Sequence, residues 1–114
     1  MNGVINQRQY TDLLIFPGGG SPNAKLYKKV YDLLIREAKN RRYDAVSVLS
    51  WPGHCNKQGR VDSELTMESA LRDATKRILE QERLRRKYHI LGRSFGTIVA
   101  VACTKNRLFS QTSG

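Results

Sequence analysis

The stretch that most constrains the fold is residues 88–104, YHILGRSFGTIVAVACT. It opens with a short apolar run, Tyr88–Leu91, which has the length and composition of a buried strand. The sequence Gly-Arg-Ser-Phe-Gly follows at 92–96, and the next seven residues are apolar on every face, as suits a short helix inside a core. A strand that turns into a helix at Gly-x-Ser-x-Gly has the layout of a nucleophile elbow.

The elbow assigns a role to each of its residues. A turn this tight predicts a strained backbone at Ser94, which lifts its hydroxyl above the sheet. Gly92 and Gly96 are expected to shape the elbow, because a side chain at either would stop the helix from closing onto the strand. The amide of Phe95 is expected to point at the same spot from the helix N-terminus. Ser94 is therefore the candidate nucleophile.

Two more strand–helix pairs precede the elbow, so the sequence predicts an α/β fold with one domain over residues 1–114. A parallel sheet with right-handed crossovers and helices on both faces follows from this alternation. Residues 1–11 are expected to be a flexible lead-in, and residues 105–114, KNRLFSQTSG, a polar tail. The predicted strands span about 12–16, 44–50 and 88–92, and the predicted helices about 25–39, 66–81 and 95–104. Thr66 is a candidate N-cap, with Glu68 in the first helical turn.

Three loops are expected at the same edge of this sheet, because each follows a parallel strand. They are Pro17–Asn23 (PGGGSPN), Trp51–Gly59 with its Pro-Gly-His stretch, and the elbow itself. Ligands of such sheets bind beyond the carboxyl ends of the strands. The three glycines of the first loop let backbone amides converge on one point.

These three loops resemble those of the α/β-hydrolase family, over roughly Leu13 to Cys103. The resemblance implies a three-layer fold in which the first strand lies between the other two. It also implies that the chain is a truncated domain, ending where such a fold is about half built. The sequence departs from the family pattern at Pro17, where the family often has His, and at Cys55, where Pro-Gly-His-Gly is typical. There is also no room for the usual hairpin before the first strand.

The activity implied by the resemblance is hydrolysis of a small-molecule acyl compound, an ester, amide or thioester, by a serine nucleophile. Attack by Ser94 creates an oxyanion, which two preorganised amides should bind. Phe95 supplies one of them. The glycine loop supplies the other, with Gly19 as first choice and Gly18 as second.

A general base is missing from the expected place. The family order is Ser, then Asp or Glu, then His, yet no Asp, Glu or His follows Ser94. His89 lies within the elbow strand and is expected to pack against a helix. His54 lies at the right edge, but two strand spacings of about 10 Å separate it from the elbow. None of the upstream residues Asp44, Asp62 and Asp73 occupies the family position of the acid. We therefore expect little or no turnover from this chain alone.

The same features are compatible with other functions. The glycine loop could cradle a phosphate, but it lacks the Gly-Lys-Ser/Thr ending of a P-loop and does not match Gly-x-Gly-x-x-Gly. The net charge of +10 favours anionic partners, so a non-catalytic basic binding module is the main alternative. The basic link Arg83–Lys87 has no interleaved aromatic side chain apart from Tyr88, which belongs to the next strand, and this argues against nucleic acid. A third hypothesis is self-association through the uncovered edge of the last strand.

The remaining features of the sequence concern the cellular compartment, membrane spans and metal or cofactor binding. No apolar run approaches the roughly 20 residues of a membrane span, and the N-terminal sequence MNGVINQRQY does not resemble a secretory signal. The two cysteines lack metal-type spacing. The sequence therefore predicts a cytoplasmic protein with reduced thiols, and indicates neither a metal nor a cofactor.

Overall fold

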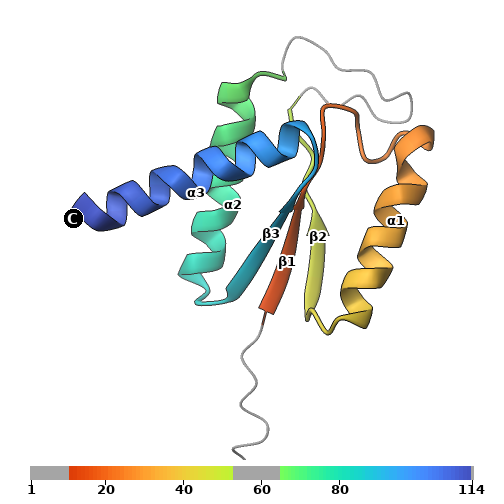
Figure 1. Ribbon diagram of the computed structural model, residues 1–114, viewed down its shortest axis with the longest axis horizontal. Coiled ribbons are helices and arrows are strands. Elements are labelled where there is room, and N and C mark those ends of the chain that lie inside the picture. Colours follow the sequence, from red (N-terminus) through yellow and green to blue (C-terminus); the bar gives the residue numbers. More distant parts are fainter. Residues whose placement is uncertain (1–10, 53–64, 114) are drawn as a thin grey trace, which may run out of the picture.

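Strands and helices alternate along the chain in a computed structural model that describes residues 11–52 and 65–113 (Figure 1). For residues 105–113 the description covers the backbone alone. In chain order the elements are β1 (Thr11–Phe16), α1 (Lys25–Asn40), β2 (Ala45–Val48), α2 (Met67–Arg83), β3 (Lys87–Gly92) and α3 (Phe95–Ser113). The predicted α/β arrangement is confirmed for this part of the chain.

The described strands form one parallel sheet in the order β2-β1-β3. β1 lies at the centre, as the resemblance implied for the first strand. Its run of consecutive apolar residues suits a strand that is covered on both faces. Phe16 is paired with Gly92, so β1 and β3 end level with each other. The loops that follow these two strands therefore leave the sheet at the same height.

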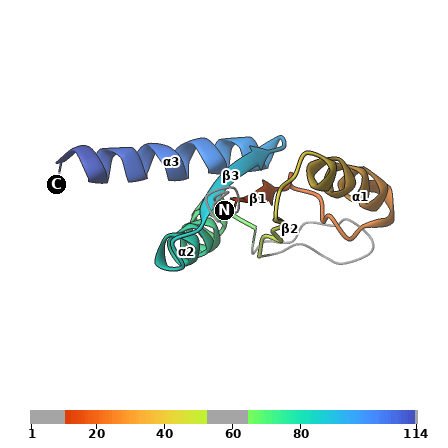
Figure 2. The ribbon, with the colours of Figure 1, turned by 90° about the horizontal axis from the view of Figure 1, so that it is seen from below.

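Helices cover both faces of the sheet. Figure 2 shows α1 on one side and α2 together with α3 on the other. Alternate residues of β1 point to opposite faces, which creates two cores. The larger core, between the sheet and α2 with α3, consists of Leu14, Phe16, Trp51, Ala70, Ala74, Ile78, Val99 and Cys103. The smaller core, beneath α1, consists of Leu13, Ile15, Tyr31 and Ala38.

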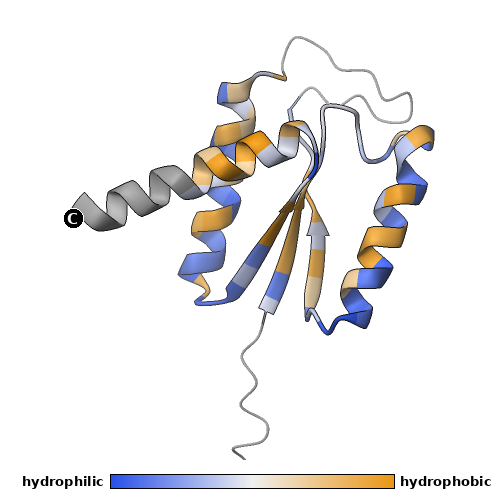
Figure 3. Ribbon diagram, in the orientation of Figure 1, coloured by the Kyte–Doolittle hydropathy of each residue, from blue (hydrophilic) through white to orange (hydrophobic). Residues whose placement is uncertain are grey.

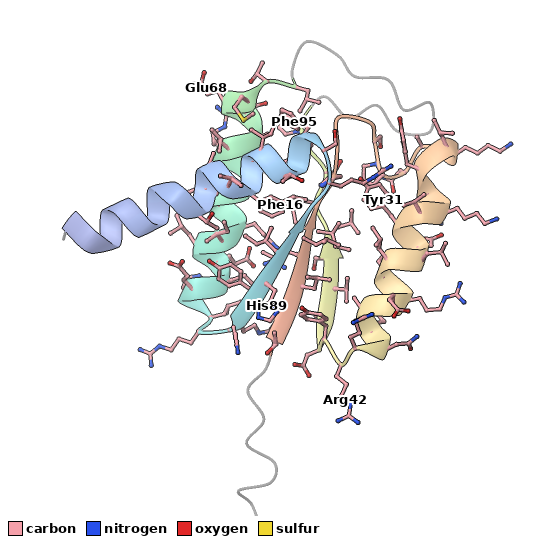
Figure 4. The ribbon with its side chains drawn as sticks, in the orientation of Figure 1. Phe16, Tyr31, Arg42, Glu68, His89 and Phe95 are labelled. Atoms are coloured by element: carbon pink, nitrogen blue, oxygen red, sulfur yellow. The ribbon has the colours of Figure 1, made fainter. Side chains whose placement is uncertain are left out.

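Local signals explain where the second helix begins and how two helices end. Thr66 is the N-cap of α2, as predicted: its hydroxyl accepts from the Ser69 amide at 3.0 Å, and the Ser69 hydroxyl accepts from the Thr66 amide at 3.1 Å. Glu68 lies in the first turn of this helix (Figure 4), where a negative charge favours the helix dipole. The turns after α1 and α2 contain Arg42 with φ 72° and Arg85 with φ 57°, left-handed conformations that often end helices.

The last helix corrects one prediction. α3 continues to Ser113, whereas the sequence predicted a helix ending at 104 and a polar tail from Lys105. The tail has no apolar period, but it also has no glycine or proline before Gly114. Each further residue of a helix adds one backbone hydrogen bond at little cost once the helix has formed. Among the predicted lead-in residues, Thr11 opens β1, and residues 1–10 lie outside the described part of the chain.

Apolar side chains remain uncovered along β3 and α3. Leu91 of β3 is 40% exposed, and Ile98 and Val101 of α3 are 58% and 59% exposed. Figure 3 shows the apolar residues along the first half of α3. None of the described helices combines the length and the hydropathy that a membrane crossing needs.

Candidate functional site

Ser94 occupies a sharp corner between β3 and α3. Its φ of 53° lies in the left-handed region, which costs a non-glycine residue about 1–2 kcal/mol. The turn is closed by two short backbone bonds: the Gly96 amide donates to the Arg93 carbonyl at 2.8 Å, and the Thr97 amide donates to the Ser94 carbonyl at 2.9 Å. The Ser94 side chain is exposed. The backbone strain predicted for this residue is therefore present.

The glycines on either side of Ser94 are fixed by close packing of backbone against backbone. A Cβ atom at Gly92 would lie 2.6 Å from the Cα of Thr97. A Cβ atom at Gly96 would collide with the carbonyl groups of Phe16 and Pro17. Any side chain at these two positions would push α3 away from the ends of the strands, which is the role that the sequence predicted for both.

The glycine loop between β1 and α1 is held by aromatic side chains. The Gly18 amide donates to the Tyr31 hydroxyl at 3.1 Å. The Tyr27 ring lies so close to Gly20 that a Cβ there would force the ring to shift. The Trp51 indole N–H donates to the Pro17 carbonyl at 2.8 Å. Tyr31 points toward this loop from the upper half of α1 in Figure 4. The loop is therefore fastened by side chains from both sides of the sheet.

The glycine loop and the elbow face each other across a small recess. A Cβ atom built at Gly18 would lie 3.5 Å from the Cβ of Ser94. The recess has a volume of about 130 Å³ and is lined by Gly18, Gly19, Gly20, Tyr27, Arg93 and Ser94. Ser94 and the glycine loop are more than 70 residues apart in the sequence. The fold brings them together at one edge of the sheet, as the sequence predicted.

The candidate oxyanion donors differ in availability. Within the described residues, the amides of Gly19 and Phe95 have no hydrogen-bond partner. The Gly18 amide is already engaged by Tyr31. Gly19 is therefore better placed than Gly18 to donate to a ligand. The Phe95 ring makes an edge contact with Trp51 at a centroid distance of 6.4 Å, so this side chain belongs to the core while its backbone begins α3.

No general base stands beside Ser94 in the described part of the chain. Among the described residues, neither a carboxylate nor an imidazole lines the recess. His54 and Asp62 lie outside the described residues. Asp44 accepts from the Thr11 amide at 2.7 Å, at the end of β1 away from Ser94. The same residues contain no group of three or more His, Cys, Asp or Glu side chains that could hold a metal ion.

His89 corrects a second prediction. Its side chain is exposed rather than packed against a helix, and its Nδ1 lies 2.8 Å from the Tyr43 hydroxyl. The rings of His89 and Tyr43 are packed edge to face, with their centroids 5.6 Å apart. His89 pairs with Leu13 and stands on β3 (Figure 4), at the edge of the described sheet, which agrees with its exposure. It lies near the middle of β3 and cannot serve Ser94.

Sequence reasoning gave no role to Arg93, which the structure places in the recess. Its guanidinium carbon lies 5.4 Å from the Tyr27 ring centroid and 5.6 Å from that of Tyr31. Two tyrosines four residues apart share one face of a helix, and this spacing directly after the glycine loop was the available signal. The two rings reach the elbow only through the order of the strands, and the sequence pattern alone does not contain that order.

A second polar cluster lies at the opposite end of the sheet. The buried Asp12 accepts from Nε2 of the buried Gln81 at 2.8 Å, and Nη1 of Arg86 lies 3.7 Å from the same oxygen. The other oxygen of Asp12 has no hydrogen-bond partner in the described part of the chain. This cluster joins β1 to α2, away from Ser94, and its role is structural.

Comparison of the chain with protein-family models, with curated proteins and with solved structures gave no match.

Proposed function

We propose that the chain carries the nucleophile elbow and oxyanion-binding part of a serine hydrolase of the α/β-hydrolase type. The observation that supports this best is Ser94 itself, which is left-handed, exposed and set between glycines opposite the Gly18–Gly20 loop. The reaction is hydrolysis of a small-molecule acyl compound, an ester, amide or thioester.

In this proposal the Ser94 oxygen attacks the acyl carbonyl carbon, and the carbonyl oxygen takes up the negative charge. The amides of Gly19 and Phe95 donate to that oxygen. Both are backbone groups held by neighbouring structure, so they need little reorganisation when the charge develops. Loss of one such donor typically raises the barrier by about 2.7–4 kcal/mol.

The weak point of this site is proton transfer. The Ser94 hydroxyl must lose its proton during attack, and a general base normally lies within about 3 Å of it. Within the described residues, no imidazole or carboxylate makes a hydrogen bond to Ser94. We therefore propose that the chain alone turns over substrate slowly or not at all, and that a base from outside the described residues completes an active site.

A thiol at position 94 tests the oxyanion donors without needing a base, because a cysteine is a strong nucleophile on its own. The variant is Ser94→Cys in a background with Cys55→Ser and Cys103→Ala, and the measurement is nitrophenolate release from 4-nitrophenyl acetate. Gly19→Pro removes the amide donor and should slow acylation about 100- to 1000-fold. Gly19→Ala is the matched control, since it keeps the amide and a Cβ there meets no atom within 4 Å.

Two results would overturn the proposal. One is a thiol at position 94 that reacts no faster than free cysteine. The other is equal acylation by the proline and alanine variants, with circular dichroism showing that both are folded. The wild-type protein adds a separate check with a fluorophosphonate probe, for which we expect slow labelling at Ser94. Rapid labelling that disappears in Ser94→Ala would show instead that a base is already in place.

A further inference from the structure

Arg93 is held in a fixed position beside the nucleophile. Its guanidinium lies over the rings of Tyr27 and Tyr31, at 5.4 and 5.6 Å from their centroids. Both rings belong to α1 and also fasten the glycine loop, one against Gly20 and the other through the Gly18 amide. Two aromatic contacts restrict a side chain that otherwise has many rotamers, and they leave the N–H groups at the rim of its plane free to donate.

Within the described residues, no acidic side chain neutralises the charge of Arg93. Among the described residues, Arg93 makes neither an ion pair nor a side-chain hydrogen bond with an acidic group, and the recess that it lines contains no acid. By contrast, Arg41 pairs with Glu37 at 3.3 Å and Arg77 with Glu80 at 3.9 Å, each within its own helix. As far as the described residues go, the recess beside Ser94 thus combines an unpaired cation with the unpaired amide of Gly19. Both groups donate to negatively charged oxygen.

The size of the recess limits what can bind. Its volume of about 130 Å³ corresponds to roughly four water molecules. Pockets that enclose a whole drug-sized ligand are larger, at about 300–1,000 Å³. A carboxylate or phosphate group fits this space, whereas a long acyl chain does not.

We propose that Arg93 is a specificity-determining residue, which binds a negatively charged oxygen group, carboxylate or phosphate, carried by the substrate that Ser94 attacks. The guanidinium fork matches two oxygens of such a group, and its aromatic seat holds it ready. The identity of the substrate as an acyl compound rests on the proposed function of Ser94. Binding of the anionic group does not, because it requires no reaction.

The test is an NMR titration of the ¹⁵N-labelled protein with succinate in one arm and inorganic phosphate in the other, at constant ionic strength. We expect saturable shifts at the Arg93 side-chain N–H and at the Gly19 amide. Arg93→Gln should weaken binding about tenfold or more, as loss of a bidentate charged contact does. Arg93→Lys, which keeps the charge but loses the fork, should fall between. The control Arg36→Gln removes the same charge from an exposed site on α1 and should change the dissociation constant less than about twofold.

Several outcomes would overturn the inference. Shifts that do not saturate, or equal weakening by Arg93→Gln and Arg36→Gln, would indicate diffuse attraction to a protein of net charge +10. Absence of shifts at both groups would exclude binding in the recess. If Arg93→Gln does not fold, Arg93→Lys against wild type decides the question. Anion binding with an inert thiol at position 94 would refute the proposed function and leave only the anion site at Arg93 standing. A reactive thiol without anion binding would support the proposed function and refute the role of Arg93.

Discussion

β1 and β3 run side by side, from Thr11 opposite Lys87 to Phe16 opposite Gly92, yet their surroundings differ. Every residue of β1 after Thr11 is buried, whereas β3 alternates between exposed and half-buried positions. β1 has a neighbour on each side, and β3 has one within the described sheet. Both strands end at the candidate site. The comparison indicates that β1 provides most of the stability of the sheet, while β3 mainly positions Ser94.

The largest contrast should come from matched truncations in the two strands. Phe16 is fully buried in the larger core, so Phe16→Ala should lower the free energy of unfolding by about 3–5 kcal/mol. Leu91→Ala in β3 should cost less than about 1 kcal/mol, because that side chain is 40% exposed. Urea unfolding followed by circular dichroism measures both. Similar losses in the two variants would refute the division of roles.

An intermediate effect is expected at the amino end of β1. Gln81→Leu removes the donor to the buried Asp12 carboxylate and should cost about 1–3 kcal/mol in urea unfolding. Arg86→Gln, immediately before β3, removes a longer contact of 3.7 Å from a side chain that is 42% exposed. It should cost under about 1 kcal/mol. A larger loss for the arginine variant would mean that the ion pair, not the amide, supports this end of the sheet.

A smaller effect on stability, but a visible one on assembly, is expected at the free side of β3. Leu91→Lys should change the free energy of unfolding by no more than about 0.5 kcal/mol. If β3 and α3 meet another copy of the chain, the same variant should shift sedimentation velocity profiles toward monomer, since an edge lysine discourages strand pairing. Leu79→Lys on α2, 46% exposed in the wild type, is the control. If the wild-type protein sediments as a monomer at every concentration, the edge of β3 is not a surface for self-association.

The smallest effect concerns Cys103, on the buried side of α3. Burial raises the pKa of its thiol, while the contact with the Thr75 hydroxyl at 3.9 Å opposes this more weakly. The pKa of the Cys103 thiol is higher in the folded than in the unfolded protein. Its pH-dependent contribution to the free energy of unfolding is therefore complete below the unfolded pKa and is lost as pH rises through the folded pKa. Between about pH 8 and pH 10, wild type should therefore lose slightly more stability than Cys103→Ala. Urea midpoints at several pH values test this, and parallel curves would count against it.

Local chemistry explains which features the sequence predicted well. The apolar run of β1 and the Thr66 cap each depend on residues close together in the chain, and the structure confirms both. The close packing at Gly92 and Gly96 agrees with the role expected of them. The central place of β1 also agrees with the expectation. The chemical role of Ser94 stays a prediction.

Features that depend on packing between distant segments were missed. The pairing of Asp12 with Gln81 joins residues 69 positions apart, and neither residue type signals the other. The seat of Arg93 on Tyr27 and Tyr31 needs the strand order and the path of the glycine loop together. The extension of α3 was missed for another reason, because apolar periodicity says nothing about a helix that leaves the core.

Trp51 is the only tryptophan in the chain, and it gives the molecule an internal optical probe. Its ring lies edge-on to Phe16 and to Phe95, and its indole N–H donates to the carbonyl of Pro17, the first residue of the glycine loop. Intrinsic emission should therefore respond to any movement of that loop relative to the elbow. Occupancy of the recess can be followed by unlabelled fluorescence, in the wild-type chain and without any chemical reaction.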